Sequence, residues 1–141
     1  MLSKQTQKYF KGKRVLVVGA AGSLGSEISR QLSKLELGQL ILFDNNETGL
    51  FEINQELPNT TPVLADIRDI QEVVKYLTQY KPDIVIHMGA YKHVPLLEKF
   101  PEAAMKNNIQ GTQNILITAS KLGIKKVVFI STDKAVEANC I

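Results

Sequence analysis

Five short apolar runs, separated by longer segments with helical periodicity, restrict the fold of this sequence more than any other feature. The runs are rich in β-branched side chains and nearly continuous in hydrophobicity, which is typical of strands that are covered on both faces. In chain order they are RVLVV (14–18), LILF (40–43), PVLA (62–65), DIVIH (83–87) and KVVFI (126–130).

The segments between the runs predict four helices. They are Leu24 to Leu35, Glu47 to Leu57, Ile70 to Tyr80, and about Pro101 to Leu122. Asp69 and Glu72 are placed as a capping box at the start of the third helix. The fourth starts near a proline, which suits a first helical turn, and ends at Gly123, which suits a left-handed cap.

This alternation of strand and helix predicts the α/β class. Parallel strands need right-handed crossovers, so such units wind into an open parallel sheet, most simply in the order 3-2-1-4-5. We therefore expect a Rossmann-like, doubly wound parallel sheet of five strands. The fold usually adds a sixth strand and its helix, so we expect residues 1–141 to be one incomplete domain, interrupted after strand five.

Composition narrows the classes of function. The chain is 44% hydrophobic and 22% charged, the balance of one soluble globular domain. Its net charge is +3, but the lysines are scattered and not interleaved with aromatic residues, which argues against nucleic-acid binding. The single cysteine, Cys140, cannot form an internal disulfide, and no Cys or His spacing predicts a metal site.

The N-terminal segment, residues 1–14, has no apolar core of a signal peptide, and no later segment approaches the length of an apolar membrane span. We therefore expect a cytoplasmic protein. Lys8, Lys11, Lys13 and Arg14 leave contact with a membrane surface open as an alternative, but a solvated lead-in to the first strand is the favoured interpretation.

A glycine-rich turn, GAAGSLGSE, follows the first predicted strand and opens the first predicted helix. The spacing of its glycines suits a dinucleotide: glycine permits the tight turn, close approach of the pyrophosphate and close packing of helix on strand. Backbone N–H groups and the helix dipole then hold the phosphates. A plain strand-to-helix turn is the alternative. The predicted cofactor-binding residues here are Gly19, Gly22, Ser23, Leu24 and Gly25.

Asp44 and Asn45 end the second predicted strand. A carboxylate at this place can accept hydrogen bonds from both ribose hydroxyls and would repel a 2′-phosphate. No arginine follows in the next residues to bind that extra phosphate. NAD is therefore favoured as the cofactor, with NADP as the alternative.

Two further strand ends contribute to the same predicted pocket. Asp66 and Ile67 leave the third strand and would provide a hydrogen bond to the adenine amino group and an apolar wall for its ring; Asp66 as an ordinary helix-start residue is the alternative. Met88, Gly89 and Ala90 leave the fourth strand, where the cofactor must approach the backbone. All these residues follow the carboxyl ends of strands, where open α/β sheets bind ligands.

Taken together, the motifs resemble those of the extended short-chain dehydrogenase/reductases, and more closely those of the CapD-like polysaccharide-biosynthesis proteins. The resemblance runs from about Lys11 to Val136 and implies a nucleotide-sugar 4,6-dehydratase, a lyase typically acting on UDP-N-acetylglucosamine. In that family hydride moves from sugar C4 to a nicotinamide, water is eliminated across C5 and C6, and hydride returns to C6. The motifs are VGAAGSLGSE, LFDNNE, ADIRD, HMGAYKHVP, NNIQGTQN and ISTDKAV.

The resemblance also implies catalytic roles after the fifth strand. Asp133 would protonate the departing C6 hydroxyl, Lys134 would take the C5 proton, and Thr132 would bond the C4 oxygen. A lysine is a base near neutral pH only if burial or a nearby cation lowers its pKa. Without the resemblance, Asp133 and Lys134 are an ordinary exposed ion pair after a strand.

The resemblance implies contacts to the cofactor or to the substrate's phosphates for Lys92 and His93, after the fourth strand, and a hydrogen bond across the active site for Asn108, which we count with the substrate-binding residues. A solvated lysine and a loop-packing histidine are the alternatives for the first two. Asn107 and Asn108 both lie in a helix interior, where asparagine is poorly favoured, and Asn108 aligns best with the family's asparagine. His87 is expected in the core.

The sequence departs from the family at two places and then ends. Val18 stands where relatives often have Thr, and residues 137–140 read EANC where relatives usually have Asn-Pro-Thr-Asn. The family's Tyr-x-x-x-Lys or Met-x-x-x-Lys would begin directly after Ile141, followed by the sugar-binding region. We therefore expect an N-terminal portion that binds cofactor but is inactive alone.

The resemblance further predicts a homo-oligomer, because relatives commonly dimerise through the helix before strand five and the helix after it, and the second of these is not in this sequence. Residues around 101–122 should then expose apolar surface, and a membrane contact would come only from an anchor elsewhere in the parent protein. Two alternative functions remain. A nucleotide-sugar 4-epimerase or reductase needs no acid and base at 133 and 134, and a non-catalytic NAD-binding module needs no substrate.

Overall fold

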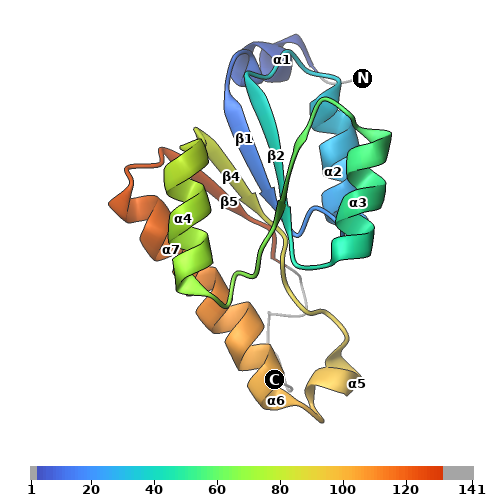
Figure 1. Ribbon diagram of the computed structural model, residues 1–141, viewed down its shortest axis with the longest axis vertical. Coiled ribbons are helices and arrows are strands. Elements are labelled where there is room, and N and C mark those ends of the chain that lie inside the picture. The colour runs from blue at the N-terminus through green and yellow to red at the C-terminus, as the bar shows by residue number, and fades with distance from the viewer. Residues whose placement is uncertain (1–2, 132–141) are drawn as a thin grey trace.

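The structure, a computed structural model, describes residues 3–131. A five-stranded parallel sheet in the order β3-β2-β1-β4-β5 forms its centre, which confirms the predicted topology (Figure 1). Because all neighbouring strands run parallel, their carboxyl ends meet at one edge of the sheet. The strands are β1 (Arg14–Val18), β2 (Gln39–Asp44), β3 (Thr61–Leu64), β4 (Ile84–His87) and β5 (Lys126–Phe129).

Helices cover both faces of this sheet. On one face lie α2 (Ser23–Ser33) and α3 (Glu47–Glu56), and on the other lie α4 (Ile70–Tyr80) and α7 (Thr112–Lys121) (Figure 1). The remaining elements are short. They are α1 (Lys4–Phe10), α5 (Val94–Leu97), α6 (Pro101–Ala104) and the π-helical segment η1 (Met105–Gly111), which joins α6 to α7.

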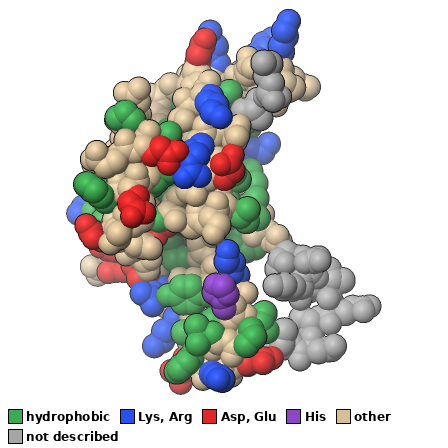
Figure 2. All heavy atoms as spheres, turned by 90° about the vertical axis from the view of Figure 1, so that its right-hand side faces the viewer, with side chains coloured by type: hydrophobic (Ala, Val, Ile, Leu, Met, Phe, Trp, Pro, Cys, Tyr) green, Lys and Arg blue, Asp and Glu red, His purple; other side chains and the backbone are tan. Residues whose placement is uncertain are grey.

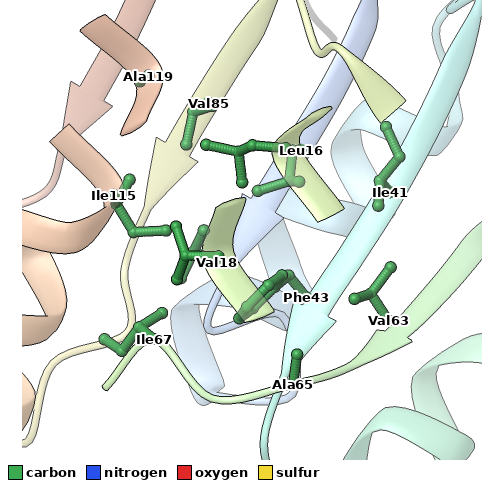
Figure 3. Close-up of a cluster of buried hydrophobic side chains, with 12 residues drawn as sticks. Leu16, Val18, Ile41, Phe43, Val63, Ala65, Ile67, Val85, Ile115 and Ala119 are labelled. Atoms are coloured by element: carbon green, nitrogen blue, oxygen red, sulfur yellow. The ribbon is translucent and has the colours of Figure 1, made fainter. Parts of the chain in front are cut away.

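The alternation of side chains along β1 and β2 separates two apolar cores. Leu16 and Phe43 belong to the core under α4 and α7, which Figure 3 shows together with Ile115 of α7. Val17 and Leu42 belong to the core under α2 and α3. Burial of one such side chain contributes roughly 1.5–3 kcal/mol, so both faces of the strands must be apolar, and the sequence runs are continuous for this reason.

Several predicted helix boundaries differ from the observed ones. Residues 4–10, predicted as a solvated lead-in, form a helix that has no buried residue, and Ser3 caps it by accepting the Thr6 N–H at 3.1 Å. The predicted fourth helix is divided into α6, η1 and α7, although it begins at a proline and is followed by Gly123 with φ +67°, as expected. The short helix α5 was not predicted.

The capping box at the start of α4 forms only in part. Asp69 accepts the Gln71 N–H at 2.8 Å, as the cap requires. The carboxylate of Glu72, however, accepts the Asp66 N–H at 2.7 Å instead of the N–H of Asp69. Glu72 therefore ties the loop after β3 to α4.

Among residues 3–131, no helix has both the length and the apolar character that a membrane span needs. Within the same range, no group of three His, Cys, Asp or Glu side chains is arranged as a metal site.

Candidate dinucleotide-binding site

The turn after β1 packs directly on the residues that follow β4. Gly19 has φ +81°, and a Cβ built on it would lie 2.8 Å from the Gly89 nitrogen and from the Met88 carbonyl carbon. A Cβ on Gly25 would overlap the carbonyl oxygen of Gly19. Glycine is thus required at the first position for backbone conformation and contact, and at the third for packing of α2 on β1.

The start of α2 has the properties of an anion site. Gly22 is the N-cap and supplies no side-chain hydrogen bond, so the first-turn N–H groups are not used by a capping side chain. Such groups, together with the positive end of the helix dipole, attract phosphate. Ser23 and Leu24, which begin the helix, are exposed.

Asp44 connects the glycine turn to the start of α3. Its Oδ2 accepts the Ala21 N–H and its Oδ1 accepts the Asn46 N–H, each at 2.9 Å. Asn46 in turn caps α3 by accepting the Gly49 N–H at 3.1 Å. A carboxylate has about four lone-pair sites, so each Asp44 oxygen can still accept a hydrogen bond from a ligand.

A pocket of about 260 Å³ lies between these elements at the carboxyl edge of the sheet. Eight of the predicted cofactor-binding residues line it: Gly19, Gly22, Asp44, Asn45, Ile67, Met88, Gly89 and Ala90. Seven further lining residues were not predicted: Val18, Ala21, Phe43, Asn46, Ala65, Tyr91 and Asn107. Most of the latter directly precede or follow a predicted residue in sequence, which is the signal that would have found them.

Asp66 lies beside the pocket and is not part of its wall. Its carboxylate forms an ion pair with Arg68 and accepts a hydrogen bond from Asn45 Nδ2 at 3.3 Å. The hydrogen bond from Arg68 is the main reason that the pKa of Asp66 falls to about 2. The carboxylate is therefore ionised and already occupied, and an adenine amino group would have to share its oxygens with Arg68 and Asn45.

The two asparagines of η1 hold the segment that follows β4. Asn107 is buried and donates from Nδ2 to the Gly89 carbonyl oxygen at 3.0 Å. Asn108 accepts the Tyr91 N–H at 2.8 Å and donates to the Tyr91 oxygen at 3.0 Å. Asn107 lines the pocket and Asn108 does not, and the substrate contact that the resemblance implies for Asn108 stays a prediction. π-helical segments often occur at functional sites, which fits the position of this pair.

Lys92 and His93 are exposed and lie between the pocket and α5. They are not part of the pocket wall, so their contact with substrate stays a prediction. Figure 2 shows, in the part of the molecule that contains α5, hydrophobic side chains next to a histidine and cationic groups. Leu96 and Phe100 are exposed in this segment.

The three predicted catalytic residues, Thr132, Asp133 and Lys134, lie outside the described residues. The residues before them reach the same edge as the pocket, because the Ile130 N–H donates to the His87 oxygen at 3.1 Å.

A sheet of this order with a glycine turn at its switch point defines a Rossmann-type domain, the class that binds dinucleotides at this edge. Residues 15–141 match the family described as polysaccharide biosynthesis protein, and the chain belongs to this family.

Relatives of the chain include sugar-nucleotide enzymes. It is 43% identical over 131 residues to capsular polysaccharide biosynthesis protein CapD of Staphylococcus aureus, covering 88% of this chain and 22% of CapD. It is 32% identical over 129 residues to a UDP-N-acetylglucosamine 4,6-dehydratase (inverting) of Campylobacter jejuni, covering 89% of this chain and 38% of that enzyme. The chain therefore spans well under half the length of these relatives.

A solved structure of similar fold contains both a dinucleotide and a sugar nucleotide. It is the UDP-glucose 4-epimerase of Stenotrophomonas maltophila with bound NAD and formylated UDP-arabinopyranose. The TM-score is 0.77 at 26% identity, covering 86% of this chain and 38% of the epimerase. Relatives of this chain thus include a sugar-nucleotide dehydratase and an epimerase solved with bound NAD, which supports an enzyme of this superfamily.

Proposed function

We propose that the chain is the NAD-binding portion of a nucleotide-sugar 4,6-dehydratase that acts on UDP-N-acetylglucosamine in the synthesis of a surface polysaccharide. The observation that carries the proposal is the pocket where the glycine turn meets Gly89 on one side and Asp44 on the other. The similarity to CapD and to the Campylobacter dehydratase supports the choice of reaction.

The pocket suits a dinucleotide in three respects. The glycine turn has no side chain at Gly19, where a Cβ would collide with the backbone of Met88 and Gly89 in the pocket wall. The uncapped start of α2 offers N–H groups to a pyrophosphate. Asp44 offers carboxylate lone pairs to the two ribose hydroxyls and repels a 2′-phosphate, which favours NAD over NADP.

The residues of this chain would then carry the proton transfers of the elimination, whereas the C4 hydroxyl proton would go to a base in the Tyr-x-x-x-Lys or Met-x-x-x-Lys segment that the resemblance places after Ile141. Bound NAD supplies reversible acceptance of hydride from sugar C4. Asp133 protonates the leaving C6 hydroxyl, Lys134 removes the C5 proton, and Thr132 donates a hydrogen bond to the C4 oxygen. These roles rest on the family resemblance. They are supported by the hydrogen bond from the Ile130 N–H to the His87 oxygen, which places Ile130, two residues before Thr132, at the same edge of the sheet as the pocket.

We further propose that Lys92, His93 and Asn108 lie on the substrate side. Lys92 is exposed and cationic next to the pocket wall at Tyr91, a suitable place to meet a diphosphate. Asn108 would act through the backbone of Tyr91, which its amide holds on both sides.

The test uses the full-length parent protein with NAD and UDP-N-acetylglucosamine. We expect a 4-keto-6-deoxy product, and we expect Lys134→Ala to abolish elimination while NAD stays bound. Lys99→Ala, an exposed lysine after α5, is the matched control and should retain activity. Unchanged turnover in Lys134→Ala would show that Lys134 is not the base that takes the C5 proton.

A 4-epimerase is the second candidate, because the structural neighbour with bound NAD is an epimerase. A product that is inverted at C4 and keeps its C6 hydroxyl would identify this reaction. Binding of NAD without turnover of any UDP-sugar would instead indicate a non-catalytic NAD-binding module.

A further inference from the structure

The carboxyl end of β4 contains a buried histidine that no step of the proposed chemistry uses. The His87 side chain is 0% exposed and belongs to the face of the sheet that α4 and α7 cover. Its ring packs against the ring of Phe129 on β5, with 5.4 Å between the centroids. A polar ring in such a place needs hydrogen-bond partners for both of its nitrogens.

Both nitrogens have partners, and these partners fix the tautomer. The Gly89 N–H lies 3.2 Å from Nδ1, and Thr112 Oγ1 lies 2.9 Å from Nε2. An amide N–H can only donate, so Nδ1 must be an unprotonated acceptor. A neutral imidazole then carries its proton on Nε2 and donates it to Thr112. Burial favours this neutral form and lowers the pKa of His87 to about 4.

Gly89 links this pair to the pocket. Its N–H donates to His87, and its carbonyl oxygen accepts from Asn107 at 3.0 Å, so side chains hold both polar groups of the residue. The same residue lines the pocket and lies against Gly19. A displacement of Gly89 therefore changes the pocket wall and the contact that supports the glycine turn.

We propose that Thr112 and His87 are positioning residues for the nicotinamide half of the dinucleotide. Thr112 fixes the orientation of the His87 ring, and the ring fixes Gly89 in the pocket wall. Neither side chain lines the pocket, so both act through the backbone of Gly89. The inference rests on the proposed binding of NAD.

The strand order tells which half of the ligand is affected. Asp44 ends β2 and Gly89 follows β4, and β1 with the glycine turn lies between them. A dinucleotide whose adenosine ribose binds at Asp44 crosses the turn with its pyrophosphate and reaches Gly89 with its other half. Loss of the Thr112–His87 contact should therefore weaken binding of NAD more than binding of AMP.

The first experiment compares Thr112→Val, which removes the hydroxyl and keeps the shape, with Thr112→Ser, which keeps the hydroxyl. Dissociation constants for NAD and AMP are measured by titration calorimetry on the full-length protein. We expect Thr112→Val to weaken NAD binding about tenfold and AMP binding less than about twofold, because a buried ring N–H loses its acceptor. Thr112→Ser should stay within about twofold for both ligands.

A second pair of variants keeps the inference testable if Thr112→Val does not fold. His87→Asn retains a side-chain oxygen near Nδ1 that can accept the Gly89 N–H, whereas His87→Leu retains no acceptor. We expect His87→Asn to bind NAD more tightly than His87→Leu, with similar AMP affinities. Equal loss for NAD and AMP, or unchanged NAD affinity, would overturn the positioning role. A wild-type protein that binds no NAD would overturn the proposed function itself.

Discussion

Gly19 and Gly89 lie against each other at the carboxyl edge of the sheet, so close that a Cβ on Gly19 would come within 2.8 Å of the Gly89 nitrogen. Gly89 is also crowded, since a Cβ built on it would lie 3.2 Å from Val18 Cγ1. The turns after β1 and β4 are therefore packed backbone to backbone. Because neither residue has a Cβ, the two turns can pack in this way, and a pyrophosphate can also approach the main chain of the glycine turn.

Gly19→Ala should abolish NAD binding and destabilise the fold. The substitution adds left-handed strain of about 1–2 kcal/mol and a collision with Gly89 and Met88 that costs about 1–3 kcal/mol more. Gly12→Ala is the matched control, because Gly12 has φ +71° but nothing within 4 Å of its added Cβ. It should show the strain alone and keep NAD affinity. Urea denaturation and NAD titration of both variants test this; equal effects on stability and binding would contradict it.

Asp44→Asn should weaken NAD binding by about tenfold or more and reduce the preference for NAD over NADP, because hydrogen bonds to a charged group contribute about 1.5–3 kcal/mol. The amide has one oxygen, so it cannot accept both the Ala21 and the Asn46 N–H groups and also bind the ribose. Dissociation constants for NAD and NADP measure the effect.

Asp83→Asn is the control for this substitution. Asp83 also accepts a backbone N–H, that of Arg14 at 2.8 Å, but it does so at the amino end of β1, away from the pocket. It should lose stability and keep NAD affinity. If both variants bound NAD equally well, Asp44 would have no role in cofactor recognition.

The strands and their order were predictable because the sheet is buried on both faces. Val15 to Val18 alternate between the two cores, so every residue is apolar and the run is visible without any structure. The glycine turn was visible for a similar reason, since only glycine fits at Gly19 and Gly25. In these places one local requirement determines the residue type.

The details of the site were less predictable because they depend on partners far apart in sequence. Asp66 as a ligand for adenine stays a prediction, but its contacts with Arg68 and Asn45 could not be predicted. Asn107 and Asn108 are adjacent and identical, but only Asn107 is part of the pocket wall. Neither outcome follows from residue type or periodicity.

Self-association should occur through the helical segment that precedes β5. As predicted, this segment exposes apolar side chains, including Met105, Ile109 and Leu116. Large exposed apolar areas are typical of interaction surfaces. We expect light scattering to detect oligomers of the chain, and Ile109→Glu with Leu116→Glu to reduce them. Phe51→Glu on α3, another exposed apolar residue, should change nothing. A wild-type chain that stays monomeric at high concentration would contradict the prediction.

His87 should make the fold less stable as the pH falls from about 6.5 to about 4. Burial lowers its pKa from 6.5 to about 4 in the folded protein, so within this range the unfolded chain binds a proton that the folded chain does not. The free energy of unfolding therefore rises with pH, and the loss between pH 7 and pH 4.5 is about 2 kcal/mol. Protonation would also remove Nδ1 as the acceptor of the Gly89 N–H.

The two histidines of the chain provide the comparison, because His93 is exposed. Urea denaturation at several pH values gives the slope for wild type, His87→Asn and His93→Asn. The carboxylates that titrate near the lower end are common to all three proteins and cancel in the differences. We expect the free energy of unfolding of His93→Asn to depend on pH as in the wild type. Between pH 7 and pH 4.5, His87→Asn should lose about 2 kcal/mol less of this free energy than the wild type does. Parallel slopes in all three would mean that folding does not lower the pKa of His87.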